Sequence, residues 1–468
     1  MTVNGGTFTY YFSEMGVNEM RMYDVIDKKK KGMELTPEEI SYVVDGYVSD
    51  EIPDYQVSAF LMAVYYKGMT KNELSVFTDR MAKSGDMVDL TSIHGIKVDK
   101  HSTGGVGDKT TLAVAPLVAA CGGRVAKMSG RGLGFTGGTI DKLESIPGLQ
   151  TTISEKRFFD IVNEIGLSVI GQSAEIAPAD KKLYALRDVT ATVDSIPLIA
   201  ASIMSKKLAS GSDKIVLDVT VGSGAFMKNA DDAIHLAERM VEIGESAGRE
   251  TIAILTNMDV PLGEAVGNDI EVIEAIETLQ GKGPDDFEQI CVEFAAQMLY
   301  LGEIADLDAC RKMVKEAIHS GKAIDKLAAM VKAQGGDETY IYHPDKFEKA
   351  PYQKELLMKN SAYIKAMDTE KCGRVSVVLG AGRETKESRI DSKAGLRFYH
   401  KTGDYVRKGE VLATLYASDE AKLDQAVNYL ETAYQYSDIK VKPKNEILAY
   451  VTKDGVKRLD HSGVESLS

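Results

Sequence analysis

The spacing of hydrophobic and polar positions changes along this chain. Between residues 20 and 84, apolar side chains recur at helical spacing. Two stretches in this part have the sequence of a capping box, Thr36 to Glu39 and Thr70 to Glu73, and Pro37 occupies the first helical position of the former. This part is therefore predicted to be a small helical domain.

After Gly85, short β-branched runs alternate with helix-like segments. The runs with the pattern of strands are 95–99, 124–129, 214–221 and 251–255. Segments such as 155–165 and 230–246 have the pattern of helices. Strands that alternate with helices indicate parallel βαβ units, whose ligands bind beyond the carboxyl ends of the strands. From about residue 372 the sequence pattern changes again. Segments 373–383 and 395–417 are predicted to be rich in short strands and turns.

Composition and charge exclude several classes of protein. The chain has 468 residues and a net charge of −14, which argues against a nucleic-acid partner. No apolar run reaches the roughly 18 residues of a membrane span, and the first residues do not resemble a secretory signal. The four cysteines are far apart and are interpreted as reduced thiols of a cytoplasmic protein. Residues 1–19 do not share the pattern that follows and are predicted to form a flexible extension.

Two glycine-rich loops, Lys100 to Thr111 and Lys127 to Glu144, each follow a predicted strand. Glycines let backbone N–H groups surround an anion, and lysine and hydroxyl side chains complete such a site. The first loop lacks the adjacent Gly-Lys pair of a nucleotide-binding P-loop. The second contains a GxGxxG match from Gly132 to Gly137, but its lysine and arginine suit free phosphate better than a dinucleotide. These residues predict a phosphate site between the two loops.

A second group of polar residues lies within 178–207. Tyr184 and Arg187 are about one helical turn apart, and Ser202 and Lys206 are spaced i, i+4 on one helical face. Their donors suit a planar ligand with carbonyl oxygens. A solvated helical face is the alternative that this spacing leaves open.

Taken together, these motifs resemble those of the thymidine and pyrimidine-nucleoside phosphorylases. The segment "SGRGLGFTGGTIDKLE" is similar to the signature of that family. The segments "KHSTGGVGD", "PADKKLYALRDVTATVDSIPLIAASIMSKK", "GSGAFMK" and "LGAGR" match it in the same order, so the resemblance covers about residues 20 to 460.

The resemblance implies an α/β fold with a small all-α domain, a large α/β domain with a mixed sheet and a C-terminal β-rich α+β subdomain. The corresponding ranges are 20–84 with 182–212, 85–181 with 213–350, and 351–468. It also implies a homodimeric pentosyltransferase of nucleoside salvage, with inorganic phosphate as co-substrate and no organic cofactor. The implied reaction is reversible phosphorolysis of uridine, thymidine and deoxyuridine to the free base and α-D-ribose 1-phosphate or its 2-deoxy analogue.

Residue by residue, the resemblance implies three sets of site residues. The phosphate ligands would be Lys100, Ser102, Thr111, Lys127, Met128, Ser129 and Thr139. The base would be bound by Tyr184, Arg187, Ser202 and Lys206. The residues implied to be catalytic are His101, Arg187 and Lys206, with His101 acting near the 2-carbonyl of the base as a proton donor or a hydrogen-bond partner.

The family also has a potassium site, whose counterparts here would be Gly107, Lys109, Leu262, Ala265 and Glu274. Lys109 departs from the family pattern, and its ammonium would either repel or replace the ion. Further departures are Phe135 in place of a histidine and Thr220 in place of a lysine.

Uridine and thymidine are both expected as substrates, because the triplet Lys127-Met128-Ser129 looks like that of the broad-specificity branch. A thymidine-specific phosphorylase is the close alternative. An anthranilate-type phosphoribosyltransferase and a non-enzymatic regulator that binds phosphate or nucleosides are the more distant ones.

Overall fold

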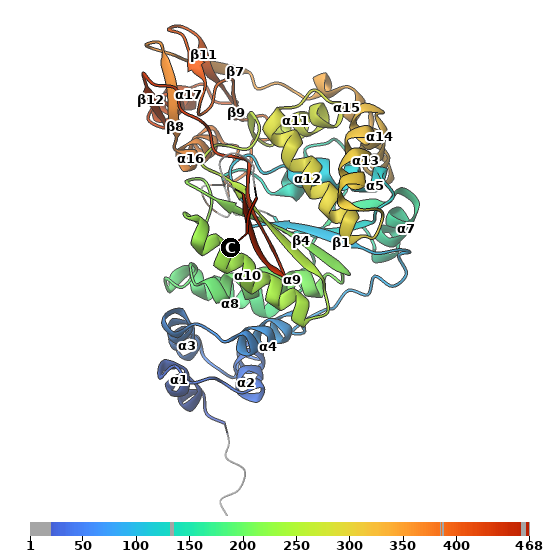
Figure 1. Cartoon of the computed structure of the whole chain (residues 1–468), viewed down its shortest axis with the longest axis vertical. Helices are drawn as coiled ribbons and strands as arrows, with labels where there is room; N and C mark the ends of the chain where they lie inside the picture. Colours follow the sequence, from blue (N-terminus) through green and yellow to red (C-terminus); the bar gives the residue numbers. More distant parts are fainter. Residues whose placement is uncertain (1–19, 132–134, 384, 386–387, 460–464, 468) are drawn as a thin grey trace, which may run out of the picture.

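The computed structural model describes residues 20–131, 135–383, 385, 388–459 and 465–467 (Figure 1). The predicted extension, residues 1–19, and two glycines of the GxGxxG match, Gly132 and Gly134, lie outside the described residues. Within the described ranges, no helix has both the length and the apolar character needed to cross a membrane.

A group of helices packs together at one end of the molecule (Figure 1): α1 (Met22–Lys30), α2 (Pro37–Val48), α3 (Asp54–Lys67), α4 (Lys71–Ala82), α8 (Pro178–Val189) and α9 (Ile196–Ala209). Both predicted capping boxes are present. The Thr36 hydroxyl accepts from the backbone N–H of Glu39 at 3.3 Å, and the Glu39 carboxylate accepts from the Thr36 N–H at 2.7 Å. Thr70 and Glu73 repeat this arrangement at the start of α4.

The central sheet is mixed, as predicted. Its parallel part consists of β1 (Val98–Ser102), β4 (Lys214–Val221) and β5 (Thr251–Asn257). Antiparallel strands continue it from β5 in the order β13 (Ile447–Thr452), β14 (Gly455–Leu459) and β15 (Glu465–Leu467). A separate parallel pair, β2 (Val125–Ser129) and β3 (Leu167–Gly171), adjoins β1 through a bridge between Lys97 and Arg124.

Helices cover both faces of this sheet (Figure 1). On one face α10 (Ala230–Ser246) contacts β4, β5 and β13, and on the other α12 (Asp285–Leu301) contacts β1 and β4. The other helices of this part are α5 (Thr110–Ala120), α6 (Thr139–Glu144), α7 (Glu155–Ile165), α11 (Asp269–Leu279), α13 (Leu307–His319), α14 (Lys322–Ala333), α15 (Thr339–Tyr342) and the 3₁₀ helix η1 (Pro344–Lys346).

The C-terminal part is β-rich and also contains helices, as predicted. A four-stranded sheet has the order β6 (Ala265–Gly267), β9 (Gly395–Phe398), β11 (Val411–Ala417) and β7 (Tyr352–Leu357). A three-stranded sheet has the order β10 (Tyr405–Val406), β8 (Ala362–Met367) and β12 (Tyr434–Ser437). The helices α16 (Thr369–Leu379) and α17 (Ala421–Glu431) pack on each other.

One prediction of secondary structure is wrong. Residues 373–379, expected in a strand-rich stretch, belong to helix α16. The carboxylate of Asp368 accepts from the backbone N–H of Lys371 at 3.1 Å and caps the helix, and Gly380 ends it with a left-handed φ of 108°. Cys372, Val375, Ser376 and Leu379 then form one buried face, so helical packing outweighs the β propensity of the valines.

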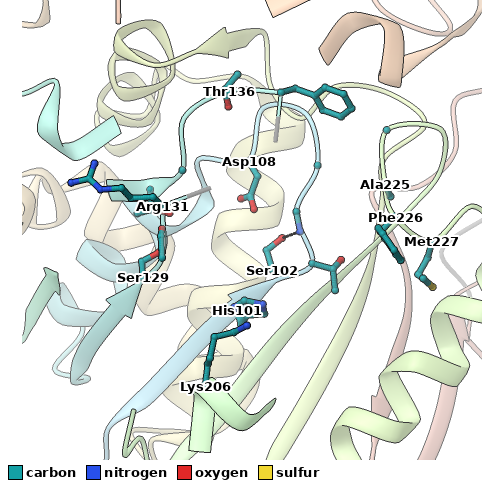
Figure 2. Close-up of a pocket in the computed structure, with 18 of the residues that line it drawn as sticks. His101, Ser102, Asp108, Ser129, Arg131, Thr136, Lys206, Ala225, Phe226 and Met227 are labelled. Carbon is teal, nitrogen blue, oxygen red and sulfur yellow. Dashed lines mark hydrogen bonds between the residues drawn. The ribbon is translucent and has the colours of Figure 1, made fainter. Parts of the chain in front are cut away.

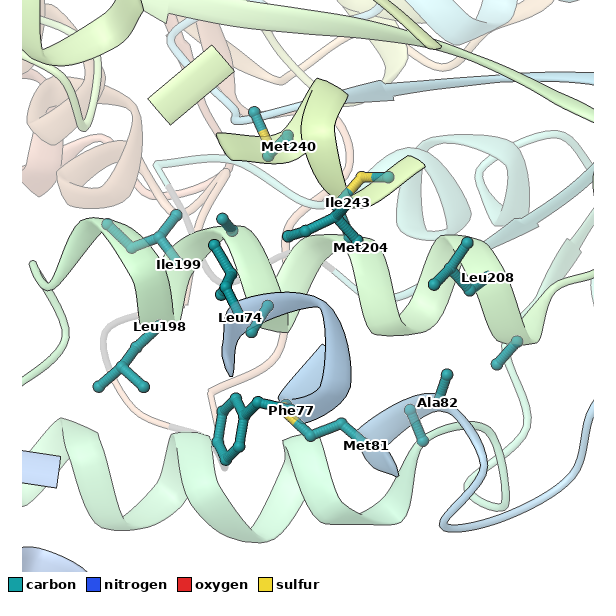
Figure 3. Close-up of a cluster of buried hydrophobic side chains, with 14 of the residues drawn as sticks. Leu74, Phe77, Met81, Ala82, Leu198, Ile199, Met204, Leu208, Met240 and Ile243 are labelled. Carbon is teal, nitrogen blue, oxygen red and sulfur yellow. The ribbon is translucent and has the colours of Figure 1, made fainter. Parts of the chain in front are cut away.

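Helix α9 joins the helical group to the sheet, because it packs on α4 on one side and on α10 on the other (Figure 3). Burying a side chain such as Phe77, Met204 or Met240 in this cluster contributes about 1.5–3 kcal/mol. The remaining labelled members are Leu74, Met81, Ala82, Leu198, Ile199, Leu208 and Ile243. The polar face of α9, which carries Ser202 and Lys206, is thereby fixed relative to the strands.

Candidate active site

A cavity of about 970 Å³ opens at the carboxyl ends of β1, β2 and β4 (Figure 2). Much of its lining comes from segments 101–105, 127–131, 135–139 and 223–228, and from Lys206 and Lys207 of α9. Parallel α/β sheets bind ligands at this edge, and both glycine loops were expected there. In Figure 2, His101 and Lys206 lie close together at the base of the cavity.

The predicted site residues divide into two groups. Those that line the cavity are His101, Ser102, Lys127, Met128, Ser129, Thr139 and Lys206. Those that do not line it are Lys100, Thr111, Tyr184, Arg187 and Ser202. The structure therefore brings both loops and α9 to one cavity. The predicted residues of the second group lie outside its lining.

The alternating direction of side chains along β1 explains why Lys100 does not line the cavity. Neighbouring side chains of a strand point to opposite faces of the sheet. Asp99 faces α9, whereas the Lys100 ammonium lies 4.9 Å from the ring centroid of Phe294 in α12. There it donates to Asp218 at 3.1 Å and to the Thr110 hydroxyl, so Lys100 supports the first loop from behind.

Positive charge is concentrated on the other face of β1. The Asp99 carboxylate accepts from Lys127 at 3.0 Å and from Lys207 at 2.7 Å, and the Lys206 ammonium lies 2.5 Å from Asp180. Burial lowers the pKa of Lys127 to about 8, because Lys207 and Lys100 add to the effect of burial and Asp99 only partly offsets it. Burial and the three nearby ammonium groups also hold the pKa of His101 well below its ordinary value. An anion bound between these groups would be stabilised.

The structure brings two of the predicted base-side residues together and directs a third elsewhere. The Lys206 ammonium lies 3.2 Å from the Ser202 hydroxyl, as their i, i+4 spacing predicts. The Arg187 guanidinium donates instead to the backbone carbonyls of Thr192, Val193 and Leu198. Its Cζ lies 5.7 Å from the Tyr184 ring centroid. Arg187 thus stabilises the turn between α8 and α9, and Asp194 of this turn and Ile196 at the start of α9 line the cavity.

Comparisons with known proteins agree with this geometry. Residues 23–85 match the helical bundle domain of a glycosyl transferase family, residues 94–324 match its a/b domain, and residues 363–437 match the pyrimidine nucleoside phosphorylase C-terminal domain. The pyrimidine-nucleoside phosphorylase of Staphylococcus aureus strain MSSA476 is 52% identical over 425 residues, which are 91% of this chain and 98% of that protein. The chain belongs to the pyrimidine-nucleoside phosphorylase family.

Further relatives support this assignment. The pyrimidine-nucleoside phosphorylase of Geobacillus stearothermophilus is 53% identical over 402 residues, 86% of this chain and 93% of that protein. The crystal structure of an anthranilate phosphoribosyltransferase from Thermus thermophilus has a TM-score of 0.55 and 18% identity, and the match covers 66% of this chain and 99% of that one. That likeness shows a shared fold, and the predicted family and fold class are both confirmed.

The residues implied for potassium lie together in this member of the family, but an amino group lies among them. The Lys109 ammonium donates to the carbonyls of Leu262 at 2.7 Å and Ala265 at 3.1 Å and lies 2.5 Å from the Glu274 carboxylate. Gly107 packs directly against the Leu262 carbonyl, because a Cβ added to Gly107 would lie 2.5 Å from that carbonyl oxygen. The oxygens that would bind the ion already bind an ammonium, so the residues present do not fit a potassium ion. Within the described ranges, no group of three or more His, Cys, Asp or Glu side chains could hold a metal ion.

Several charged residues of the site were not predicted. Asp108 and Lys142 line the cavity, and the Lys142 ammonium donates to the Asp108 carbonyl at 2.8 Å. Asp99 and Lys207 form the buried charge pair described above. The sequence could have indicated a buried ion pair at Asp99, because an acidic residue inside a buried parallel strand is rare unless it has a partner of opposite charge.

We expect kcat/KM for phosphate to fall as pH rises through about 8. We expect the charged form of Lys127 to bind phosphate in the free enzyme, and this ammonium loses its proton in that range. Initial rates at limiting phosphate, measured from slightly acidic to alkaline pH, check this expectation.

The matched control is Lys127→Arg, whose guanidinium stays charged throughout this range. The alkaline decline should disappear in this variant, even if its maximal rate is lower. An unchanged decline would show that another group titrates.

Proposed function

We propose that this chain catalyses the reversible phosphorolysis of pyrimidine nucleosides to the free base and α-D-ribose 1-phosphate or its 2-deoxy analogue. The observation that carries the proposal is one cavity in which two glycine-rich loops with lysine and hydroxyl side chains meet Lys206 of α9, in a chain 52% identical to a pyrimidine-nucleoside phosphorylase. Inorganic phosphate is the co-substrate, and no organic cofactor takes part.

Phosphate binds on the side of the two loops in this proposal. Lys127 supplies charge, and Ser102, Ser129 and Thr139 supply hydroxyl donors from loop segments that line the cavity. The pyrimidine binds toward α9, where Lys206, held at 3.2 Å by the Ser202 hydroxyl, meets its carbonyl oxygens. Tyr184 and Arg187 join the base side when the helical group closes on the loops.

The reaction breaks the bond between C1′ of the sugar and N1 of the base and forms a bond between C1′ and a phosphate oxygen. The bonding electron pair leaves with the base, while positive charge grows on the sugar. Phosphate held on the face opposite the base supplies both the nucleophile and a compensating negative charge. Such positioning supplies roughly 7–11 kcal/mol. The Lys206 ammonium stabilises the negative charge that develops on the pyrimidine oxygens.

His101 acts on the base in this proposal, as a hydrogen-bond partner while its imidazole is neutral and as a proton donor when it is charged. Its imidazole is neutral in the free enzyme near neutral pH, because burial and the nearby ammonium groups lower its pKa. A neutral imidazole can donate a hydrogen bond to the 2-carbonyl of the base. A bound phosphate dianion would raise the His101 pKa and favour protonation of the leaving base.

We expect phosphorolysis of both uridine and thymidine, because Lys127, Met128 and Ser129 line the phosphate side as a triplet that looks like the broad-specificity branch. Release of uracil and of thymine, measured with the same enzyme and phosphate concentrations, checks this. Negligible uracil release beside rapid thymine release would identify a thymidine-specific enzyme instead.

A homodimer, a cytoplasmic location and a role in nucleoside salvage complete the proposal. These three features rest on the resemblance to the family. Light scattering of the purified protein tests the first, because a monomer of 50.9 kDa and a dimer differ clearly in mass.

A further inference from the structure

The side chain of Lys109 ends in a fully buried cage of oxygens. Its ammonium meets the Leu262 carbonyl at 2.7 Å, the Ala265 carbonyl at 3.1 Å and the Glu274 carboxylate at 2.5 Å, and its side chain has no exposed surface. An ammonium group has three N–H donors. Two hydrogen bonds and one ion pair therefore surround it with three oxygens.

The cage is built closely around this group. An added Cβ on Gly263 would lie 2.7 Å from the Lys109 nitrogen, and one on Gly107 would lie 3.4 Å from it. Both glycines have left-handed φ, 67° and 81° respectively, which other residues rarely adopt. The second carboxylate oxygen of Glu274 accepts from the backbone N–H of Ala265 at 2.9 Å, so the carboxylate is held in place.

We propose that the Lys109 ammonium replaces the monovalent cation at this position, so that the enzyme works without potassium. Backbone carbonyls and a carboxylate are oxygen ligands of the kind that bind potassium. An ammonium group is of similar size, carries the same charge and is covalently attached, so it occupies the cage at any ionic composition. The inference rests on the proposed phosphorolysis for its kinetic part and on the cage alone for its stability part.

The position of Lys109 gives the replacement a role in phosphate binding. Lys109 directly precedes α5, and its neighbour Asp108 lines the cavity. The Lys109 ammonium connects the start of α5 to the loop that carries Leu262, through a hydrogen bond, and to Glu274 of α11, through an ion pair. Lys109 is therefore a positioning residue that holds the first glycine loop against the rest of the α/β domain.

The test compares the wild-type protein with Lys109→Ser in potassium chloride and in choline chloride of equal ionic strength. We expect wild-type kcat/KM for phosphate and the midpoint of thermal unfolding to be the same in both salts. Lys109→Ser should lose on the order of 100-fold in kcat/KM in choline, because the loop is misplaced. Potassium should restore most of that loss and raise the unfolding midpoint of this variant, since an ion that binds the folded state stabilises it.

Lys29→Ser is the matched control. Lys29 is also a buried lysine, but its ammonium donates to the two carboxylate oxygens of Glu73 at 2.8 Å and, among the described residues, to no backbone carbonyl. We expect this variant to be destabilised equally in both salts.

Two results would overturn the inference. One is a wild-type enzyme that needs potassium for activity, a result that does not depend on any variant folding. The other is a Lys109→Ser protein whose activity and unfolding midpoint do not respond to potassium. Absence of phosphorolysis by the wild-type protein in every salt would contradict the proposed function, while the unfolding measurements would still test the cage.

Discussion

Replacing Lys206 with alanine is expected to reduce turnover by about 10²–10³-fold, the typical effect of removing one donor from a site of developing negative charge. Lys206 lines the cavity beside His101, and its ammonium is held by Asp180 at 2.5 Å and by Ser202 at 3.2 Å. These contacts orient it before substrate arrives. Steady-state rates of uridine phosphorolysis, with circular dichroism to confirm folding, measure the effect.

Lys182→Ala is the control for this experiment. Lys182 lies on α8 in the same group of helices, but its ammonium contacts Asp50 and the Tyr47 carbonyl and it does not line the cavity. Activity of this variant should stay close to that of the wild type. If Lys206→Ala retained near-normal activity, the assignment of the base side to α9 would be wrong.

Asp99→Asn should lower the free energy of unfolding by about 3–5 kcal/mol, because the change leaves two buried ammonium groups without their carboxylate. The Asp99 side chain is buried, and its two oxygens bind Lys127 and Lys207. These lysines hold the pKa of Asp99 below its ordinary value. The contribution of the Asp99 carboxylate to the free energy of unfolding is therefore fully present above about pH 4. It is lost as pH falls through the lowered pKa of Asp99. Denaturant unfolding near neutral pH measures the loss.

A surface pair supplies the comparison for Asp99→Asn. Glu250 pairs with Lys214 at 2.5 Å, and their side chains are 39% and 21% exposed. Glu250→Gln should cost at most about 1 kcal/mol. Equal losses in the two variants would contradict the view that Asp99 balances a buried cluster of positive charge.

Local signals in the sequence predicted local structure well. The capping boxes at Thr36 and Thr70 are present, and the helix-like segments 155–165 and 230–246 have the bounds of α7 and α10. Each depends on residues a few positions apart, so the sequence contains the whole signal. The predicted strand 95–99 is instead β1, Val98–Ser102, because its pairing with β4 begins at Val98 and Lys214 and extends to Ser102 and Asp218.

Contacts between distant residues were harder to predict. Asp99 and Lys207 are 108 positions apart, and only the packing of α9 beside β1 brings their side chains together. The same limit applies to Lys100, since its direction depends on which face of β1 meets α12. Family resemblance only implied a cation site around Lys109, whereas the distances show that its ammonium lies among the carbonyl and carboxylate oxygens of that set.

Incubating the protein with uridine and inorganic phosphate, and measuring uracil, phosphate and ribose 1-phosphate together, tests the central claim most directly. We predict that uracil and ribose 1-phosphate form in equal amounts as phosphate is consumed, and that no uracil forms when phosphate is omitted. Uracil release that does not require phosphate would contradict the account. So would an absence of uracil together with transfer to anthranilate that depends on phosphoribosyl pyrophosphate.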